Sequence, residues 1–273
     1  MSELKLGRLP QRRVGNRFAI AWAHQYMAAA IPAPVYPIDV SGGITAWGML
    51  GNDQYGDCGE AGQLHYQMAS SAATGTFPAG AAFTDQIAIA EYLAFTNGQD
   101  TGVVLADFLL WLYRKGEILG FAPVDLSNRA QADSLMAIFH GLYVGVSLTP
   151  DAQQLFGAGR PWTVVNGERP DPQLGHCILK VRTDGAAMES YVTWGIEQAA
   201  TRDWSAACVD EAWVVVTTQD QADQLNMPAL FADIDALGGI GSAQPGTPNP
   251  TPPQGCLPML GLLPASLLAR LFT

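Results

Sequence analysis

The chain has 273 residues, of which 48% are hydrophobic and 14% are charged, and its formal net charge is −11 at pH 7. A chain of this length and polarity can bury a substantial core, which excludes an intrinsically disordered protein. The acidic balance argues against general nucleic-acid binding, because that function needs a basic surface. We therefore expect one globular domain with extensions.

The N-terminal segment is an exception to the acidic balance. Its basic residues are Lys5, Arg8, Arg12, Arg13 and Arg17. Residues 1–16 are predicted to be extended, residues 18–30 to form a short helix, and the prolines at positions 32, 34 and 37 to lead the chain into the domain. We expect residues 1–37 to be a basic arm and an entry segment, in which the arm either stays solvated or docks on an acidic partner surface.

Four helices are predicted in the first half of the domain. Apolar periodicity places them at residues 57–72, 84–95, 102–115 and 128–140. Thr84 is a suitable N-cap for the second helix, and Gly116 ends the third.

Beyond residue 140 the apolar pattern changes from helical to alternating. Strands are predicted at residues 141–148, 177–181, 190–194 and 211–217. A helical front half followed by a β back half indicates an α+β domain, which we place at residues 38–237.

The C-terminal region differs in composition from the domain. Residues 238–254 are rich in Gly, Pro, Ser and Asn and are predicted to be a linker. Residues 255–273 are apolar, but Pro258 and Pro264 interrupt them, so no membrane span is predicted. This tail either folds back on its own domain or docks into a partner or a neighbouring subunit.

The cysteines and the N-terminus indicate where the protein resides. Cys58, Cys177, Cys208 and Cys256 lack the CxxC spacing of a zinc ribbon or redox dithiol. We expect reduced thiols, no cofactor and no metal. No signal peptide is recognised, so a cytoplasmic or virion-associated protein is expected.

Cys58 follows the motif Asn-Asp-Gln-Tyr-Gly-Asp at residues 52–57 and opens the first predicted helix. The unpaired amides and the dipole of a helix N-terminus favour a thiolate, which is the nucleophilic form of cysteine. The alternative is that Cys58 is a small buried residue, as a lone cysteine commonly is.

His176 stands at the start of a predicted strand, 118 residues after Cys58. It is either the base that activates the thiol or a satisfied histidine of the core. His65 lies two turns along the helix of Cys58, too far to reach the sulfur, and is interpreted as structural.

These residues resemble the papain-like cysteine peptidase superfamily, and more closely a group of uncharacterised bacterial and phage proteins with an NDxxGDC motif and a later TWG. The resemblance implies a papain-like α+β fold, with an antiparallel β half and the site in the cleft between the halves. It implies that Cys58 is the nucleophile and His176 the base. It also implies that Asn52, six residues before Cys58, helps to form the oxyanion hole.

The chain departs from the family pattern after the histidine. The family has Asn-Ser-Trp-Gly sixteen residues on, where this chain has Val192-Thr193-Trp194-Gly195. Val192 cannot orient an imidazole. Three outcomes follow from this departure: a Cys–His dyad, an inactive protein, or replacement of the missing residue by one of Glu197, Asp210 and Glu211.

We therefore expect a cysteine hydrolase that acts on peptide or isopeptide bonds of a peptide or protein substrate. The alternative is a catalytically inactive papain-like protein that serves in structure or virion assembly, joined to itself or to a partner through the arm and the tail. A cell-wall amidase is a third and weaker alternative.

Overall fold

The computed structural model describes residues 4–10, 20–75, 83–164 and 168–240. Most of the predicted linker and the whole apolar tail, including Cys256, lie outside the described residues. The last helix continues to Ile240 and includes the first three residues assigned to the linker.

One antiparallel sheet of seven strands organises the domain. The strands are β1 (Ile38–Asp39), β2 (Gly120–Pro123), β3 (Leu142–Ser147), β4 (Gly175–Thr183), β5 (Met188–Thr193), β6 (Ile196–Thr201) and β7 (Val209–Val216). Their order is β2-β7-β3-β4-β5-β6, and β1 pairs with the end of β4. The α+β class expected from the sequence is therefore confirmed.

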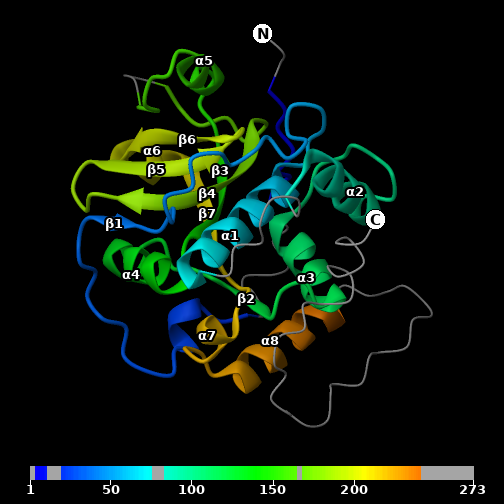
Figure 1. Ribbon diagram of the computed structural model, residues 1–273, viewed down its shortest axis with the longest axis vertical. Coiled ribbons are helices and arrows are strands. Elements are labelled where there is room, and N and C mark those ends of the chain that lie inside the picture. The colour runs from blue at the N-terminus through cyan, green and yellow to red at the C-terminus, as the bar shows by residue number, and fades with distance from the viewer. Residues whose placement is uncertain (1–3, 11–19, 76–82, 165–167, 241–273) are drawn as a thin grey trace.

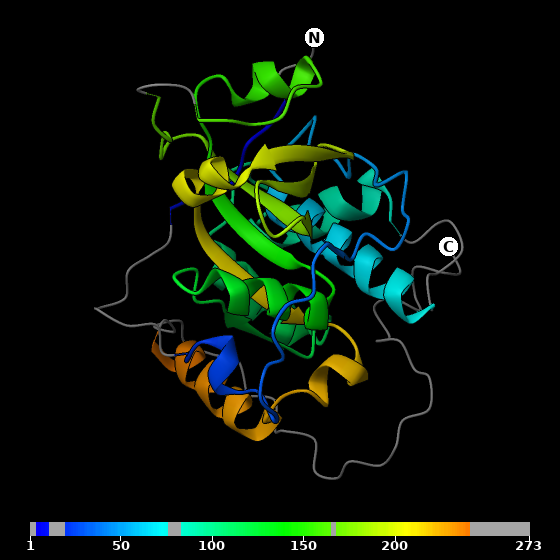
Figure 2. The same cartoon turned by 90° about the vertical axis from the view of Figure 1, so that its left-hand side faces the viewer.

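The helices surround this sheet (Figures 1 and 2). They are the 3-10 turn η1 (Ala23–Gln25), α1 (Cys58–Thr74), α2 (Asp85–Phe95), α3 (Leu105–Lys115), α4 (Arg129–Phe139), α5 (Ala152–Gly157), α6 (Arg202–Cys208), α7 (Gln219–Ala222) and α8 (Met227–Ile240). Figure 1 shows α1, α2 and α3 close together, with α1 running along the sheet.

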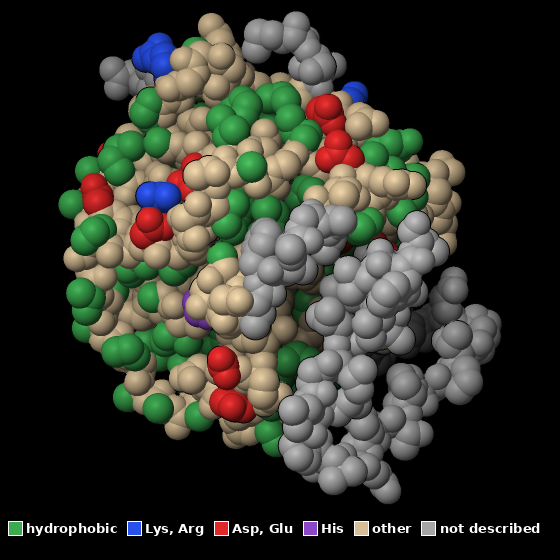
Figure 3. Space-filling view, in the orientation of Figure 1, with side chains coloured by type: hydrophobic (Ala, Val, Ile, Leu, Met, Phe, Trp, Pro, Cys, Tyr) green, Lys and Arg blue, Asp and Glu red, His purple; other side chains and the backbone are tan. Residues whose placement is uncertain are grey.

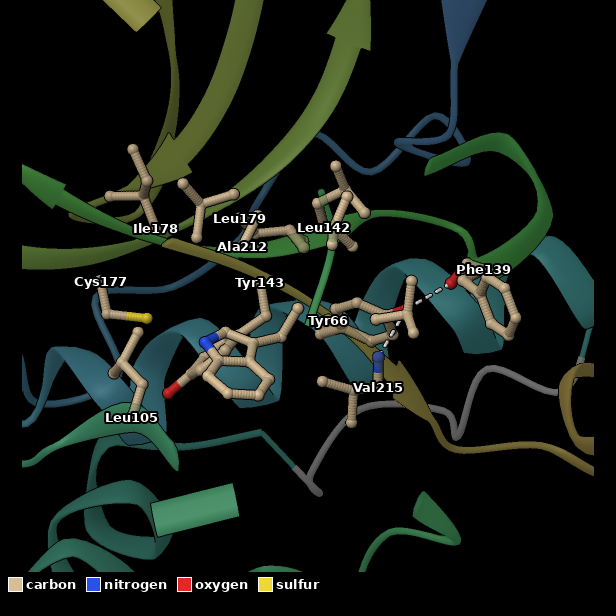
Figure 4. Close-up of a cluster of buried hydrophobic side chains, with 14 of the residues drawn as sticks. Tyr66, Leu105, Phe139, Leu142, Tyr143, Cys177, Ile178, Leu179, Ala212 and Val215 are labelled. Carbon is tan, nitrogen blue, oxygen red and sulfur yellow. Dashed lines mark hydrogen bonds between the residues drawn. The ribbon is translucent and has the colours of Figure 1, made fainter. Parts of the chain in front are cut away.

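Side-chain alternation along β4 separates the two faces of the sheet. Cys177 and Tyr143 face α1: a Cβ atom built on Gly62 of α1 would lie 3.1 Å from the Cys177 sulfur and 3.2 Å from the Tyr143 ring. Figure 4 shows these two side chains near one another in the buried cluster. On the other face, Lys180 reaches Asp133 of α4 at 2.9 Å. Both faces are thus buried beneath helices.

The four predicted helices are confirmed, and local signals explain their ends. Thr84 accepts a hydrogen bond from the Ile87 amide and caps α2, and Asn128 accepts one from the Gln131 amide and caps α4. Gly116 ends α3 in the left-handed region, at φ 74°.

The predicted helix at residues 18–30 was wrong over the residues that are described there. Only the short turn η1 forms, and no side chain caps it. Tertiary contacts compete with the helix: the Ala28 amide donates to the Gln224 carbonyl, and the Tyr26 hydroxyl donates to Asp233 of α8. Such contacts override a weak local preference.

The surface carries no basic patch on the face seen in Figure 3, where Lys and Arg side chains are scattered. Among the residues that the structure describes, no helix has both the length and the apolar character needed to cross a bilayer.

Candidate active site

The loop before α1 fixes the position of Cys58, the first residue of that helix. The Tyr55 amide donates to the Gly51 carbonyl at 3.0 Å and forms the turn. The Gly56 amide donates to the Asp100 carboxylate at 2.9 Å and ties the loop to the segment before α3. The sequence motif therefore does place a cysteine at a helix N-terminus.

The thiol of Cys58 is not the exposed, ionised group expected from that position. Its residue is fully buried, and burial raises the pKa of the thiol to about 12. The backbone amides of Cys177 and Gly7, which face the sulfur as hydrogen-bond donors, oppose this shift without reversing it. Desolvation exceeds the effect of the helix N-terminus, so the thiol is neutral in this arrangement.

Asp57 occupies the N-cap position of α1, but its side chain caps no helix amide. Neither carboxyl oxygen has a partner at hydrogen-bonding geometry among the described residues. Burial raises the pKa of Asp57 to about 8, and the nearby amide of Asn52 opposes the shift. Asp57 is therefore a buried carboxyl group that is protonated near neutral pH.

Asn52, the expected oxyanion donor, is buried in the same loop. Its side-chain amide donates to the Tyr55 backbone carbonyl at 3.3 Å, and the backbone carbonyl of Asn52 accepts from the Lys5 backbone amide at 3.2 Å. The amide group is thus engaged within the loop, and its catalytic role stays a prediction.

His176, at the beginning of β4, is held on two sides. Its Nε2 atom lies 2.7 Å from the Thr193 hydroxyl oxygen. Its ring stacks on Trp194, with ring centroids 4.4 Å apart and an interplanar angle of 19°. Burial lowers the pKa of His176 to about 3, and the charge of Arg8 acts in the same direction. The imidazole is therefore neutral.

Thr193 supplies the contact that Val192 cannot make. The two residues are adjacent on β5, so their side chains point to opposite faces of the sheet. Val192 is fully buried, whereas the Thr193 hydroxyl meets the imidazole. The sequence comparison missed Thr193 because it counted sixteen residues from His176 and so arrived at Val192. The hydroxyl of the next residue was the available signal, but strand alternation decides which of the two side chains faces His176.

The three acidic residues considered as replacements for the missing orienting group bind cations instead. Glu197 pairs with Arg182 at 2.8 Å. Asp210 and Glu211 pair with Arg8 of the arm at 2.6 and 3.1 Å.

The structure places the Cys58 sulfur near the backbone of Cys177, the residue after His176. Among the described residues, no hydrogen bond joins the Cys58 and His176 side chains. The Nδ1 atom of His176, the ring nitrogen not held by Thr193, has no hydrogen-bond partner among the described residues. Because Cys177 faces α1, the adjacent His176 side chain points to the opposite face of the sheet, and the thiol–imidazole pair is not formed.

The remaining candidates are structural. Cys177 and Cys208 are buried free thiols. His65 lies 3.0 Å through Nε2 from the Gly48 carbonyl and packs edge-on against Trp47.

Within the described ranges, no group of three or more His, Cys, Asp and Glu side chains is placed to hold a metal ion. No protein-family model matches the chain, and no curated protein is significantly similar to it.

Proposed function

We propose that the protein is a papain-like cysteine hydrolase that cleaves peptide or isopeptide bonds through Cys58 and His176. One observation carries the proposal. The Cys58 sulfur lies beside the His176–Cys177 peptide, while Thr193 holds one ring nitrogen of His176 and the other has no partner among the described residues.

The contact with Thr193 determines how His176 would act. If Nε2–H donates to the Thr193 hydroxyl oxygen, Nδ1 carries the lone pair and is the base. Nδ1 then takes the proton of the Cys58 thiol, and the thiolate attacks the carbonyl carbon of the substrate. The Cys58 amide and the Asn52 side chain would donate to the oxyanion.

The second half of the reaction restores the enzyme. The imidazolium gives its proton to the leaving amine as the C–N bond breaks, and a thioester remains on Cys58. Water then hydrolyses the thioester, releasing the acid and returning the thiol.

The described arrangement is a resting state in this proposal. Cys58 is fully buried, Gly7 of the N-terminal arm faces its sulfur, and the Trp194 ring donates through Nε1 to the Lys5 carbonyl at 3.1 Å. The pKa of the thiol is raised and that of the imidazole is lowered, both by burial. Displacing the arm would admit water and substrate, and the ion pair would then require the His176 ring to turn toward the face of the sheet that carries α1.

The test uses the full chain with Gly7→Val, because a Cβ atom at Gly7 would lie only 1.7 Å from the Gly56 carbonyl oxygen. We expect this clash to displace the arm. We expect this variant to hydrolyse a quenched-fluorescent peptide library. Its Cys58 should react with iodoacetamide at least tenfold faster than in the parent chain, as measured by peptide mass mapping.

Two further changes in the same background serve as controls. Cys58→Ser and His176→Gln should each abolish hydrolysis, and His176→Gln should also slow the labelling of Cys58. Cys208→Ser, which removes a buried thiol elsewhere, should leave both rates unchanged. Labelling of Cys58 that does not depend on His176 would reject the catalytic pair.

A non-catalytic structural or assembly protein is the second candidate. It is favoured by the absence of a thiol–imidazole hydrogen bond between two buried, neutral groups. A chain ending after Ile240 keeps α8 whole and removes the rest of the predicted linker and the tail. If the tail joins subunits, this truncation lowers the oligomeric state on a sizing column, and an unchanged state counts against assembly through the tail.

A further inference from the structure

The described part of the N-terminal arm, residues 4–10, is bound like an added strand rather than packed by side chains alone. The Val103 amide donates to the Gly7 carbonyl, and the Leu9 amide donates to the Val103 carbonyl, both at 2.7 Å. This is a parallel bridge in which Arg8 stands opposite Val103. Main-chain bonding of this kind is how proteins capture extended peptides.

The arm lies between Val103 on one side and Gly175 of β4 on the other, and we call the space that it fills the cleft. The backbone on the Gly175 side also forms hydrogen bonds with the arm. The Arg8 amide donates to the Gly175 carbonyl at 3.2 Å, directly before His176. On the other side of Gly7, the Lys5 amide donates to the Asn52 carbonyl at 3.2 Å. The arm therefore bonds to Asn52 and to the residue before His176, so it lies beside residues that we predict to do the chemistry.

Glycines allow the arm to come this close. A Cβ atom at Gly175 would lie 2.2 Å from the Arg8 carbonyl oxygen, and one at Gly102 would lie 2.2 Å from the Gly7 carbonyl oxygen. On the arm itself, Gly7 lies against the Gly56 carbonyl, where no side chain fits. The cleft thus selects glycine at one position of its occupant.

The residue after this glycine, Arg8, is bound through its positive charge. The Arg8 side chain is 5% exposed and reaches two carboxylates at the beginning of β7: its Nε lies 3.1 Å from Glu211, and a terminal nitrogen lies 2.6 Å from Asp210. Gly145 leaves room for it, because a Cβ atom there would lie 2.8 Å from the Arg8 Nε. A planar guanidinium can donate to both carboxylates at once, which an ammonium group does less well.

We propose that this cleft is a recognition site for extended peptides in which glycine precedes arginine, and that residues 4–10 are its resident occupant. The inference rests on the proposed function in one respect, since it names the substrate class of the Cys58 site. Binding itself needs only the glycine-lined walls and the two carboxylates.

The experiment measures binding of a fluorescently labelled synthetic peptide that copies residues 4–10. The resident arm competes at an effective concentration that can reach the millimolar range. We therefore expect the Gly7→Val chain to bind the peptide at least tenfold more tightly than the parent chain. Replacing the arginine of the peptide by alanine should weaken binding at least tenfold, and replacing it by lysine should weaken it less.

A second route to an empty cleft guards against misfolding of one variant. Arg8→Ala in the full chain removes the ion pairs of the arm and should also raise peptide affinity, with circular dichroism checking the fold of both variants. Adding Glu211→Gln to either variant should weaken binding of the arginine peptide and leave the affinity of the alanine peptide unchanged. Equal affinities for the arginine and alanine peptides, or binding to neither variant, would overturn the inference.

Adding Cys58→Ala to the Gly7→Val chain separates this inference from the proposed function. Binding of the arginine peptide should persist with the same dissociation constant while hydrolysis is lost. Selective binding without any hydrolysis by the Gly7→Val chain would reject the hydrolase alone. Hydrolysis that shows no preference for Gly-Arg peptides would reject the recognition site alone.

Discussion

Two regions of the molecule bury ionisable groups in opposite ways. In the cluster between the sheet and helices α4 and α6, the Lys180 ammonium lies 2.9 Å from both Asp133 and Glu189, and Arg202 lies 3.2 Å from Asp133. We call these four residues the ion-pair cluster. Around Cys58, by contrast, the thiol, the Asp57 carboxyl and one nitrogen of His176 are buried, and none of them forms an ion pair with a residue in the described part of the chain.

The difference shows that a partner, rather than burial alone, decides whether a buried group stays charged. Burial opposes ionisation of Glu189, yet Lys180 and the hydrogen bonds around it bring its pKa below the ordinary value. Asp57 has no such cation, and burial raises its pKa to about 8. Glu189 therefore stays charged in the ion-pair cluster, whereas the groups around Cys58 are neutral in this arrangement.

The largest expected effect comes from breaking the ion-pair cluster. Lys180→Ala leaves two carboxylates buried with one cation between them. We expect the free energy of unfolding to fall by about 3–5 kcal/mol, because an unpaired buried charge is strongly destabilising. Urea denaturation at pH 7 measures this loss.

Arg182 provides a matched control, two residues further along β4. It also pairs with two carboxylates, Asp39 and Glu197, but its side chain is 42% exposed. Arg182→Ala should cost about 1 kcal/mol or less, since water screens exposed pairs. Equal losses for the two variants would mean that burial does not distinguish the two sites.

The second prediction concerns the neutral carboxyl near Cys58. Because the pKa of Asp57 is raised from 3.8 to about 8, the native state binds more protons than the unfolded state between these pH values. The free energy of unfolding therefore falls as the pH rises, by up to about 1.4 kcal/mol per unit. Urea denaturation should show that the parent chain loses about 2–3 kcal/mol relative to Asp57→Asn between pH 5 and pH 7.

The control for this experiment is Asp184→Asn, which changes an exposed carboxyl whose pKa is lowered by backbone hydrogen bonds. That variant should keep the pH dependence of the parent chain over the same range. A constant difference between the parent chain and Asp57→Asn from pH 5 to pH 7 would show that Asp57 is ionised throughout.

The smallest expected effect is at the hydroxyl that holds His176. Thr193→Val keeps the shape of the side chain but leaves Nε2 of the imidazole without its partner. We expect the free energy of unfolding to fall by about 1–3 kcal/mol, the cost of an unsatisfied buried polar group. Thr193→Ser retains a hydroxyl and should lose less, and thermal unfolding of both variants makes the comparison. Equal losses would indicate that the methyl group matters rather than the hydrogen bond.

The elements that the sequence predicts well are those whose signals are local. Thr84, Asn128 and Gly116 cap or end helices through bonds and dihedral angles that span a few residues, so α2, α3 and α4 can be recognised without the fold. Strand β6 and helix α6 were missed because Ile196–Thr201 is only partly apolar and Arg202–Cys208 is short. Their positions depend on packing against β5 and β7.

The candidate site divides in the same way. The motif at residues 52–58 and the strand after Gly175 select Cys58 and His176 by chemistry and spacing. The protonation of these groups could not be predicted, because the pKa of a thiol or an imidazole depends on what covers it. Predicting the contact of Thr193 with His176 requires knowing the direction of side chains on β5. Predicting the ion pairs of Arg8 requires knowing that β3 and β7 lie side by side.

The sequence by itself determined the α+β class, the main helices and a cysteine at a helix N-terminus, since these follow from periodicity and from caps a few residues apart. Only the tertiary structure decided that the basic arm lies against that cysteine, because its bonds to Val103, Gly175 and Glu211 join residues far apart in the chain. Burial acts through such distant contacts. For that reason the charge of the site is a property of the fold and not of the motif.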